Sequence, residues 1–154
     1  MRALALMTIA TSLALGGCAG KPTEPEVSDM VVRMAANPKA PSAGYFTING
    51  GPSDDILLSV TSPVVIRIEM HESMIGRDPS ASSGGAMASM KPLEGGVAIP
   101  ANGTVKFEPG GKHLMLYNIN PGMKAGQTIR LDYVFASGLQ LQAYAPLRAA
   151  GSAE

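Results

Sequence analysis

The stretch His113-Leu114-Met115-Leu116-Tyr117 decides the fold, because its two leucines alternate strictly with the other side chains. This period of two is typical of a β-strand that has one face on a hydrophobic core. In such a strand His113, Met115 and Tyr117 share one face, and the leucines point into the core. The stretch therefore predicts a strand with an H-x-M pair on its outer face, the two α-carbons about 6–7 Å apart.

A second stretch, Ile66-Arg67-Ile68-Glu69-Met70-His71, has the same period. We expect its isoleucines and Met70 on the inner face and His71 on the outer face, together with Arg67 and Glu69. These two stretches contain the only two histidines of the chain. Both histidines are therefore predicted to lie outside the core.

Short apolar segments, separated by turns rich in Gly, Pro and Asn, continue along the rest of the chain, and no long segment has a helical period. This rhythm predicts an all-β fold, an antiparallel β-sandwich or Greek-key barrel. The segment from Gly76 to Gly85 is small and polar and predicts a long surface loop. The expected strands are 30–34, 45–48, 56–60, 64–70, 97–99, 104–107, 113–117, 128–135 and 139–144.

Imidazole and thioether side chains gather in the 46 residues from Met70 to Met115. Together they suit copper(I), whereas zinc prefers thiolate, imidazole or carboxylate ligands and magnesium or calcium needs oxygen ligands. The alternative is that the methionines fill the core and the histidines are ordinary surface residues. The side chains concerned are Met70, His71, Met74, Met87, Met90, His113 and Met115.

The N-terminus predicts export. Residues 1–17 have the charged start and short apolar run of a signal peptide, and Leu15-Gly16-Gly17-Cys18 resembles a bacterial lipobox. We expect lipid on Cys18, a flexible tether over 18–28, one domain over 29–147 and a flexible tail over 148–154. Ala19 after the cysteine favours the outer membrane. The alternative is that the signal is cleaved elsewhere and Cys18 is discarded with it.

Composition excludes several classes of function. The 154 residues are enough for one domain, and the formal net charge is zero without any basic run, so nucleic-acid binding is not expected. Cys18 is the only cysteine, so a lipidated protein has no thiolate for a blue-copper site. Two histidines are too few for a three-histidine zinc enzyme, and no nucleophile has a recognisable base. We therefore expect that the protein is not an enzyme.

Three blocks resemble the periplasmic copper chaperones of the PCuAC type, and the likeness covers nearly the whole mature chain. The resemblance implies a cupredoxin-like β-sandwich that binds copper(I) through two histidines and two methionines and delivers it towards the copper centres of respiratory oxidases. The blocks are Glu69-Met70-His71-Glu72, Met90-Lys91-Pro92-Leu93-Glu94-Gly95-Gly96 and Glu108-Pro109-Gly110-Gly111-Lys112-His113-Leu114-Met115-Leu116.

Carried over by position, the resemblance implies His71, Met90, His113 and Met115 as the copper ligands. The gap between His71 and Met90 is longer than in the family, so Met87 is held as the substitute for Met90. Met74 is a weaker candidate, for a ligand on the path into the site.

The sequence thus predicts a monomeric copper(I) carrier in the periplasm, held to the membrane by lipid. Its partner would be a copper acceptor, either an oxidase copper-centre domain or another copper carrier. Glu69 or Glu72 is expected to accept a hydrogen bond from the second ring nitrogen of a histidine ligand. The alternatives are a copper storage or tolerance lipoprotein without a dedicated acceptor, and an envelope β-sandwich lipoprotein that binds a protein partner and no metal.

Overall fold

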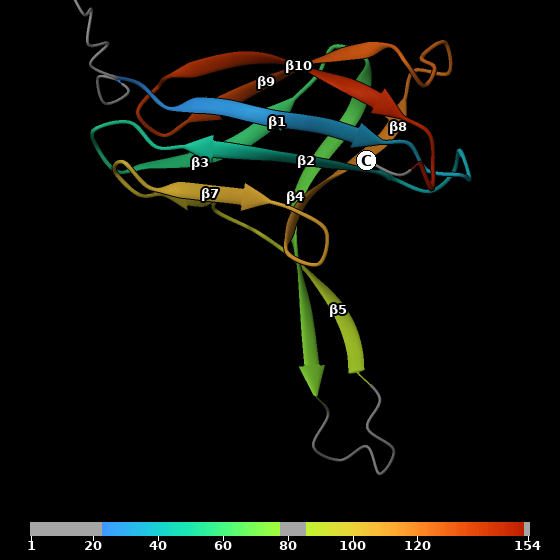
Figure 1. Ribbon diagram of the computed structural model, residues 1–154, viewed down its shortest axis with the longest axis horizontal. Helices are drawn as coiled ribbons and strands as arrows, with labels where there is room; N and C mark the ends of the chain where they lie inside the picture. The colour runs from blue at the N-terminus through green and yellow to red at the C-terminus, as the bar shows by residue number, and fades with distance from the viewer. Residues whose placement is uncertain (1–22, 78–85, 153–154) are drawn as a thin grey trace, which may run out of the picture.

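The protein is all-β, as predicted: the computed structural model describes residues 23–77 and 86–152, and these residues form ten strands and no helix (Figure 1). Consequently no helix in this part of the chain is long and apolar enough to cross a membrane. The signal peptide, Cys18 and the start of the tether lie outside the described residues. The strands are β1 (Glu26–Arg33), β2 (Ser42–Asn49), β3 (Asp55–Thr61), β4 (Val65–Arg77), β5 (Ala86–Pro92), β6 (Val97–Ile99), β7 (Thr104–Phe107), β8 (Lys112–Ile119), β9 (Thr128–Phe135) and β10 (Gln140–Arg148).

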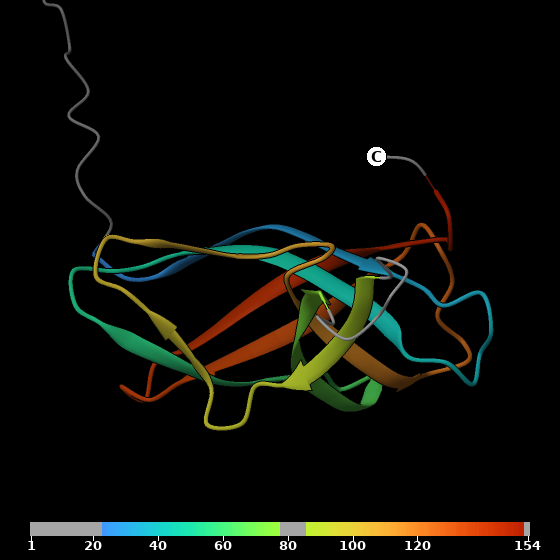
Figure 2. The same ribbon diagram turned by 90° about the horizontal axis from the view of Figure 1, so that it is seen from below.

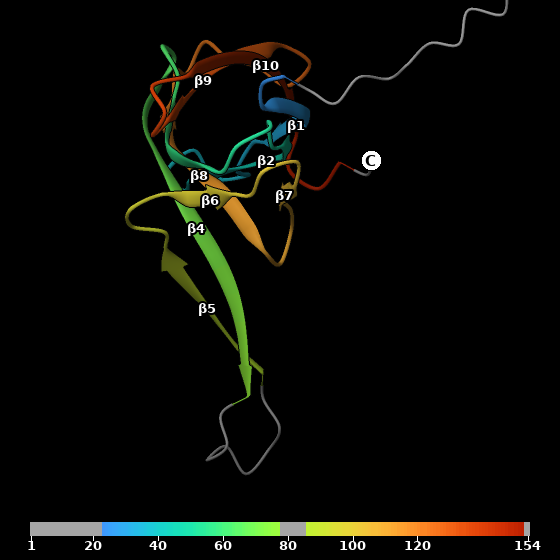
Figure 3. The same ribbon diagram turned by 90° about the vertical axis from the view of Figure 1, so that its left-hand side faces the viewer.

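The strands form a single curled sheet in the order β5-β4-β8-β7-β2-β1-β10-β9-β3-β6. Neighbouring strands are antiparallel except for the parallel pairs β1–β10 and β7–β8. Figure 3 shows the sheet curling round until β9 and β10 lie across the interior from β2 and β8. Figure 2 shows the same body from below, with β4 and β5 pointing towards the viewer. The curl encloses one hydrophobic core.

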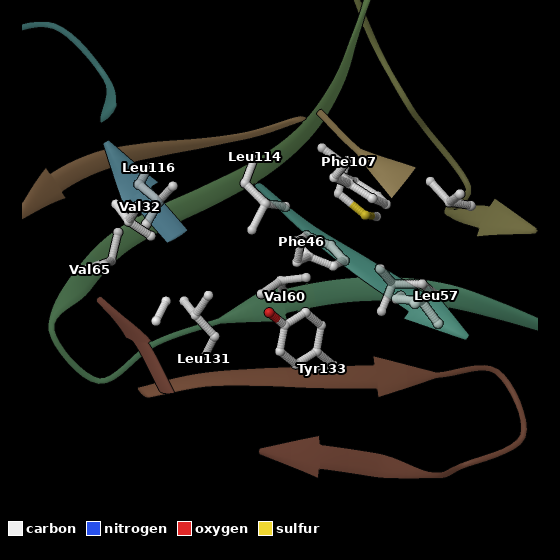
Figure 4. Close-up of a cluster of buried hydrophobic side chains, with 14 of the residues drawn as sticks. Val32, Phe46, Leu57, Val60, Val65, Phe107, Leu114, Leu116, Leu131 and Tyr133 are labelled. Atoms are coloured by element: carbon white, nitrogen blue, oxygen red, sulfur yellow. The ribbon is translucent and has the colours of Figure 1, made fainter. Parts of the chain in front are cut away.

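Three aromatic rings lie at the centre of this core (Figure 4). Phe46 and Phe107 are partners in the β2–β7 register and stack with ring centroids 4.1 Å apart. The Tyr133 ring meets Phe46 edge-on at 5.2 Å. Such pairs each contribute about 0.5–1.5 kcal/mol beyond the burial of their area. Tyr133 has no exposed surface, and burial raises the pKa of its hydroxyl.

Each predicted strand has a counterpart in the structure, and three strands, β6, β7 and β9, have the predicted bounds. The tether predicted over 18–28 is too long, because β1 already begins at Glu26 and pairs with β2 from that residue. The prediction for Ile66 is wrong: its side chain is 81% exposed, while the preceding Val65 is buried. The core covers the face that Ile68 and Met70 share, but it does not reach Ile66. This residue lies at the start of β4 and lines a surface cavity.

Strand β5 was not predicted. It pairs with the second half of β4, from His71 to Arg77, whereas β8 pairs with the first half, from Val65 to Glu72. The pairing of β4 with β8 ends at Glu72, and the rest of β4 extends away from the body together with β5 as an arm (Figures 1 and 3). Gly76 and Arg77, expected in a loop, belong to β4, and residues 78–85 lie outside the described residues. His71 is therefore at the base of the arm, where β4 has a partner on both sides.

Candidate metal centre

The outer face of β4 and β8 consists of three cross-strand pairs. In the antiparallel register His71 lies opposite His113, Glu69 opposite Met115, and Arg67 opposite Tyr117. Because alternate residues of a strand share a face, these six side chains lie on the side of the sheet away from Leu114 and Leu116, which are buried in the core. The register therefore places His71, His113 and Met115 on one face, as the sequence predicted.

The register of β5 separates Met90 from Met87. Met90 pairs with Ser73, and His71 pairs with Pro92, so Met90 is the diagonal neighbour of His71 on the same face of the sheet. Diagonal neighbours have α-carbons about 7–8 Å apart, within reach of a long side chain. Met87 pairs with Gly76, and Met74 pairs with Ser89. Gly76 and Met74 are even-numbered positions of β4, whereas His71 and Ser73 are odd-numbered, so these two pairs have the other parity along the strand. Among these methionines only Met90 has the parity of the histidine pair.

The two imidazole rings are close enough to share one ion. Their centroids are 6.2 Å apart, with an angle of 35° between the ring planes. Two metal–nitrogen bonds of about 2 Å each, added to the two ring radii, span a separation of this order. Both histidines lie on the predicted outer face, but they are largely covered there: His113 is 8% exposed and the side chain of His71 is 13% exposed. Met90, on the arm, is 60% exposed.

Glu69 is the carboxylate that contacts a predicted ligand. Its Oε2 lies 3.1 Å from Nε2 of His71, and its Oε1 lies 3.4 Å from Nε of Arg67. The hydrogen bond with His71 and the charge of Arg67 lower the pKa of Glu69 against the opposing effect of desolvation. Glu72, the other carboxylate expected from the sequence, pairs instead with Lys112 at 2.8 Å.

A backbone carbonyl holds the second histidine. Nδ1 of His113 lies 3.0 Å from the carbonyl oxygen of Gly111, which also accepts the backbone N–H of Ser73 at 3.0 Å. One oxygen thus joins the β4 backbone to the ring on β8. The glycine was visible in the sequence two residues before His113, but nothing there assigned a role to its carbonyl.

Tyr117 and Arg67 support the methionine of the H-x-M pair. The Tyr117 hydroxyl donates to Sδ of Met115 at 3.7 Å, and the Arg67 guanidinium lies 4.2 Å above the centre of the tyrosine ring. Partial burial and the nearby negative charge of Glu69 raise the pKa of Tyr117. The alternation of the two strands predicted both residues on this face. Their contacts with Met115 and Glu69 were not predicted.

The described residues contain no group of three or more His, Cys, Asp or Glu side chains that could bind a metal ion. Thioethers are not among these four side-chain types, so the His–Met face remains a candidate site. A surface cavity of about 970 Å³ lies between Met34, Ile66 and Met123, and none of the four predicted ligands lines it.

Comparison with solved structures identifies the fold. The structure resembles a copper-bound PCuAC domain from PmoF2, with a TM-score of 0.62 and 17% sequence identity, covering 82% of this chain and 93% of that one. It also resembles the copper(I) form of DR1885 from Deinococcus radiodurans, with a TM-score of 0.58 and 20% identity, covering 86% of this chain and 83% of that one. The predicted cupredoxin-like, PCuAC-type fold is confirmed.

Among curated proteins, a putative lipoprotein of Leifsonia xyli subsp. xyli (strain CTCB07) is 30% identical over 90 residues. The match covers 58% of this chain and 49% of that relative, so the chain spans about half of the relative's length. Residues 26–147 match the family described as putative lipoprotein LpqE-like, and these residues include every strand except the last residue of β10. The chain therefore belongs to the LpqE-like family of putative lipoproteins, with the fold of the PCuAC domains.

Proposed function

We propose that the protein is a copper(I) carrier whose site consists of His71, Met90, His113 and Met115. One observation carries this proposal: the strand register puts all four residues on one sheet face, with the two histidines directly opposite each other. The similarity to domains described as copper-bound supports the choice of metal.

The chemistry of these four side chains favours copper(I). Thioether is a soft ligand and neutral imidazole a borderline one, so together they suit the soft monovalent copper(I) ion and match hard ions such as magnesium and calcium poorly. The ligands themselves carry no charge, and the carboxylate of Glu69, in contact with His71, is already paired with Arg67. The site therefore holds copper(I) without leaving several negative charges unpaired once the metal is released.

The uneven burial of the ligands supports transfer by ligand exchange. The histidines are nearly enclosed at the base of the arm, whereas Met90 is mostly exposed. An acceptor's ligand can reach the ion from the side of Met90 while His71 and His113 still hold it. Loss of Met90 first and of the histidines last gives a path in which the ion is never without ligands.

The remaining parts of the proposal concern location and partner. Lipid on Cys18 would hold the domain at the envelope, in agreement with the description of the family as lipoproteins. The acceptor would be a copper-centre domain of a respiratory oxidase or another copper carrier in the periplasm. Transfer separates a carrier from a storage protein: copper should move from the loaded protein to an apo oxidase copper-centre domain, and retention of the copper would favour storage.

Titration with copper(I) against a chromogenic chelator, under anaerobic and reducing conditions, tests the site. We expect one tightly bound equivalent for the full chain and its loss in the His113→Ala/Met115→Ala double variant. Met74→Leu is the matched control, since Met74 is 51% exposed on the same arm but has the other parity. Undiminished affinity in the double variant would refute the proposed ligands.

A further inference from the structure

The hydrogen bond of His113 determines which of its nitrogens can bind a metal. A carbonyl oxygen only accepts, so the contact between Nδ1 and the oxygen of Gly111 requires the proton of the neutral ring to be on Nδ1. Nε2 of His113 then has a free lone pair. A metal bound to this histidine is therefore expected at Nε2.

The hydrogen bond of His71 has the opposite consequence. An ionised carboxylate also only accepts, so the contact between Nε2 and Oε2 of Glu69 requires the proton to be on Nε2. The free lone pair is then on Nδ1. This atom is buried and has no hydrogen-bond partner among the described residues. A buried acceptor without a partner is unfavourable unless another group fills the place, and a bound cation would fill it.

We propose that the two histidines bind copper(I) through different ring nitrogens, His71 through Nδ1 and His113 through Nε2, and that Glu69 is the positioning residue that fixes this arrangement. The inference rests on the proposed function, because it assumes that this face binds copper(I). Arg67 forms an ion pair with the other carboxylate oxygen, Oε1, and so helps to fix the orientation of Glu69. Glu69 thereby sets both the tautomer and the orientation of His71 before the metal arrives.

The tautomers can be tested before any metal is added. Long-range proton–nitrogen correlation spectra of the ¹⁵N-labelled full chain, recorded where both rings are neutral, should show His71 protonated on Nε2 and His113 protonated on Nδ1. Addition of one equivalent of copper(I) should shift Nδ1 of His71 and Nε2 of His113 and leave the two protonated nitrogens as N–H groups. Copper(I) shifting Nε2 of His71 would overturn the inference.

Two variants test the positioning role. Glu69→Ala should give His71 a second set of ring signals and weaken copper(I) binding by about 10–100-fold, as loss of such partners does in other metal sites. Glu69→Gln, which retains a carbonyl acceptor, should restore the single set. Glu72→Ala is the control, because that carboxylate pairs with Lys112 and should leave the ring signals of both histidines unchanged. A Glu69→Ala spectrum identical to wild type would overturn the role of Glu69.

Failure of the proposed function has a different signature. If copper(I) shifts none of the four ring nitrogens, the site does not bind it, and both the copper proposal and the metal part of this inference fall. If copper(I) binds and both histidines use the same nitrogen, the function stands and only this inference falls.

Discussion

Replacement of Met90 by leucine should weaken copper(I) binding without destabilising the fold. The change removes the thioether and keeps most of the side-chain volume, and Met90 is 60% exposed on an arm outside the core. The free energy of unfolding should therefore change by less than about 0.5 kcal/mol. Loss of a mere supporting partner commonly weakens metal binding about 10–100-fold. Loss of a ligand should thus cost at least tenfold in affinity, about 1.4 kcal/mol.

Met87→Leu is the matched control, because Met87 lies on the same strand at a position of the other parity. Chelator competition of both variants and the wild type, with thermal melts of the metal-free proteins, separates binding from folding. We expect weaker binding for Met90→Leu and wild-type binding for Met87→Leu. The reverse result would show that Met87 is the ligand, and wild-type affinity in both would remove the third ligand from the proposal.

The remaining predictions concern stability. Tyr133→Phe should raise the free energy of unfolding by about 1 kcal/mol, because it deletes a buried hydroxyl without a hydrogen-bond partner among the described residues; destabilisation in urea titrations would contradict this. Asp55→Asn should lower the melting temperature at neutral pH. Hydrogen bonds from the β9–β10 turn and from the adjacent backbone outweigh desolvation and lower the pKa of Asp55. Its stabilisation is therefore complete above the unfolded-state pKa of about 3.9 and is lost as the pH falls through the lower folded-state pKa. The difference between variant and wild type in melts should shrink below pH 4, and a constant difference would refute this cause. Gly50→Ala should destabilise the fold by about 1–3 kcal/mol, because a Cβ there would lie 2.2 Å from the carbonyl oxygen of Pro100. Gly111→Ala is the control, since its Cβ would meet nothing nearer than 3.6 Å, and equal melting temperatures for the two variants would contradict the prediction.

Strand period explains how much of the fold and site could be predicted. Alternation in 113–117 and 66–71 depends only on neighbouring residues, and a strand must put alternate side chains on opposite faces. The outer-face positions of His71, His113 and Met115 could therefore be predicted before any tertiary contact was known. Turn residues likewise bounded β6, β7 and β9, because glycine, proline and asparagine mark strand ends locally.

Burial could not be predicted in the same way. The face of a strand follows from its period, but whether that face is covered depends on strands far away in sequence. His113 and His71 are on the predicted face and yet nearly enclosed, at the point where β4 is paired with both β5 and β8. Strand β5 itself has no apolar alternation and no β-branched residue, so its sequence gave little indication of a strand.

The choice between Met87 and Met90 needed the register for a physical reason. In the β4–β5 hairpin each odd residue of β4 pairs with an even residue of β5, as His71 does with Pro92. A slip of one residue would reverse this parity and give Met87 the face of the histidines. The length of the inserted segment does not determine the register, so strand period alone could not separate the two methionines, and only the family resemblance favoured Met90. Met90→Leu and Met87→Leu therefore test the pairing of β4 with β5 as directly as they test the identity of the ligand.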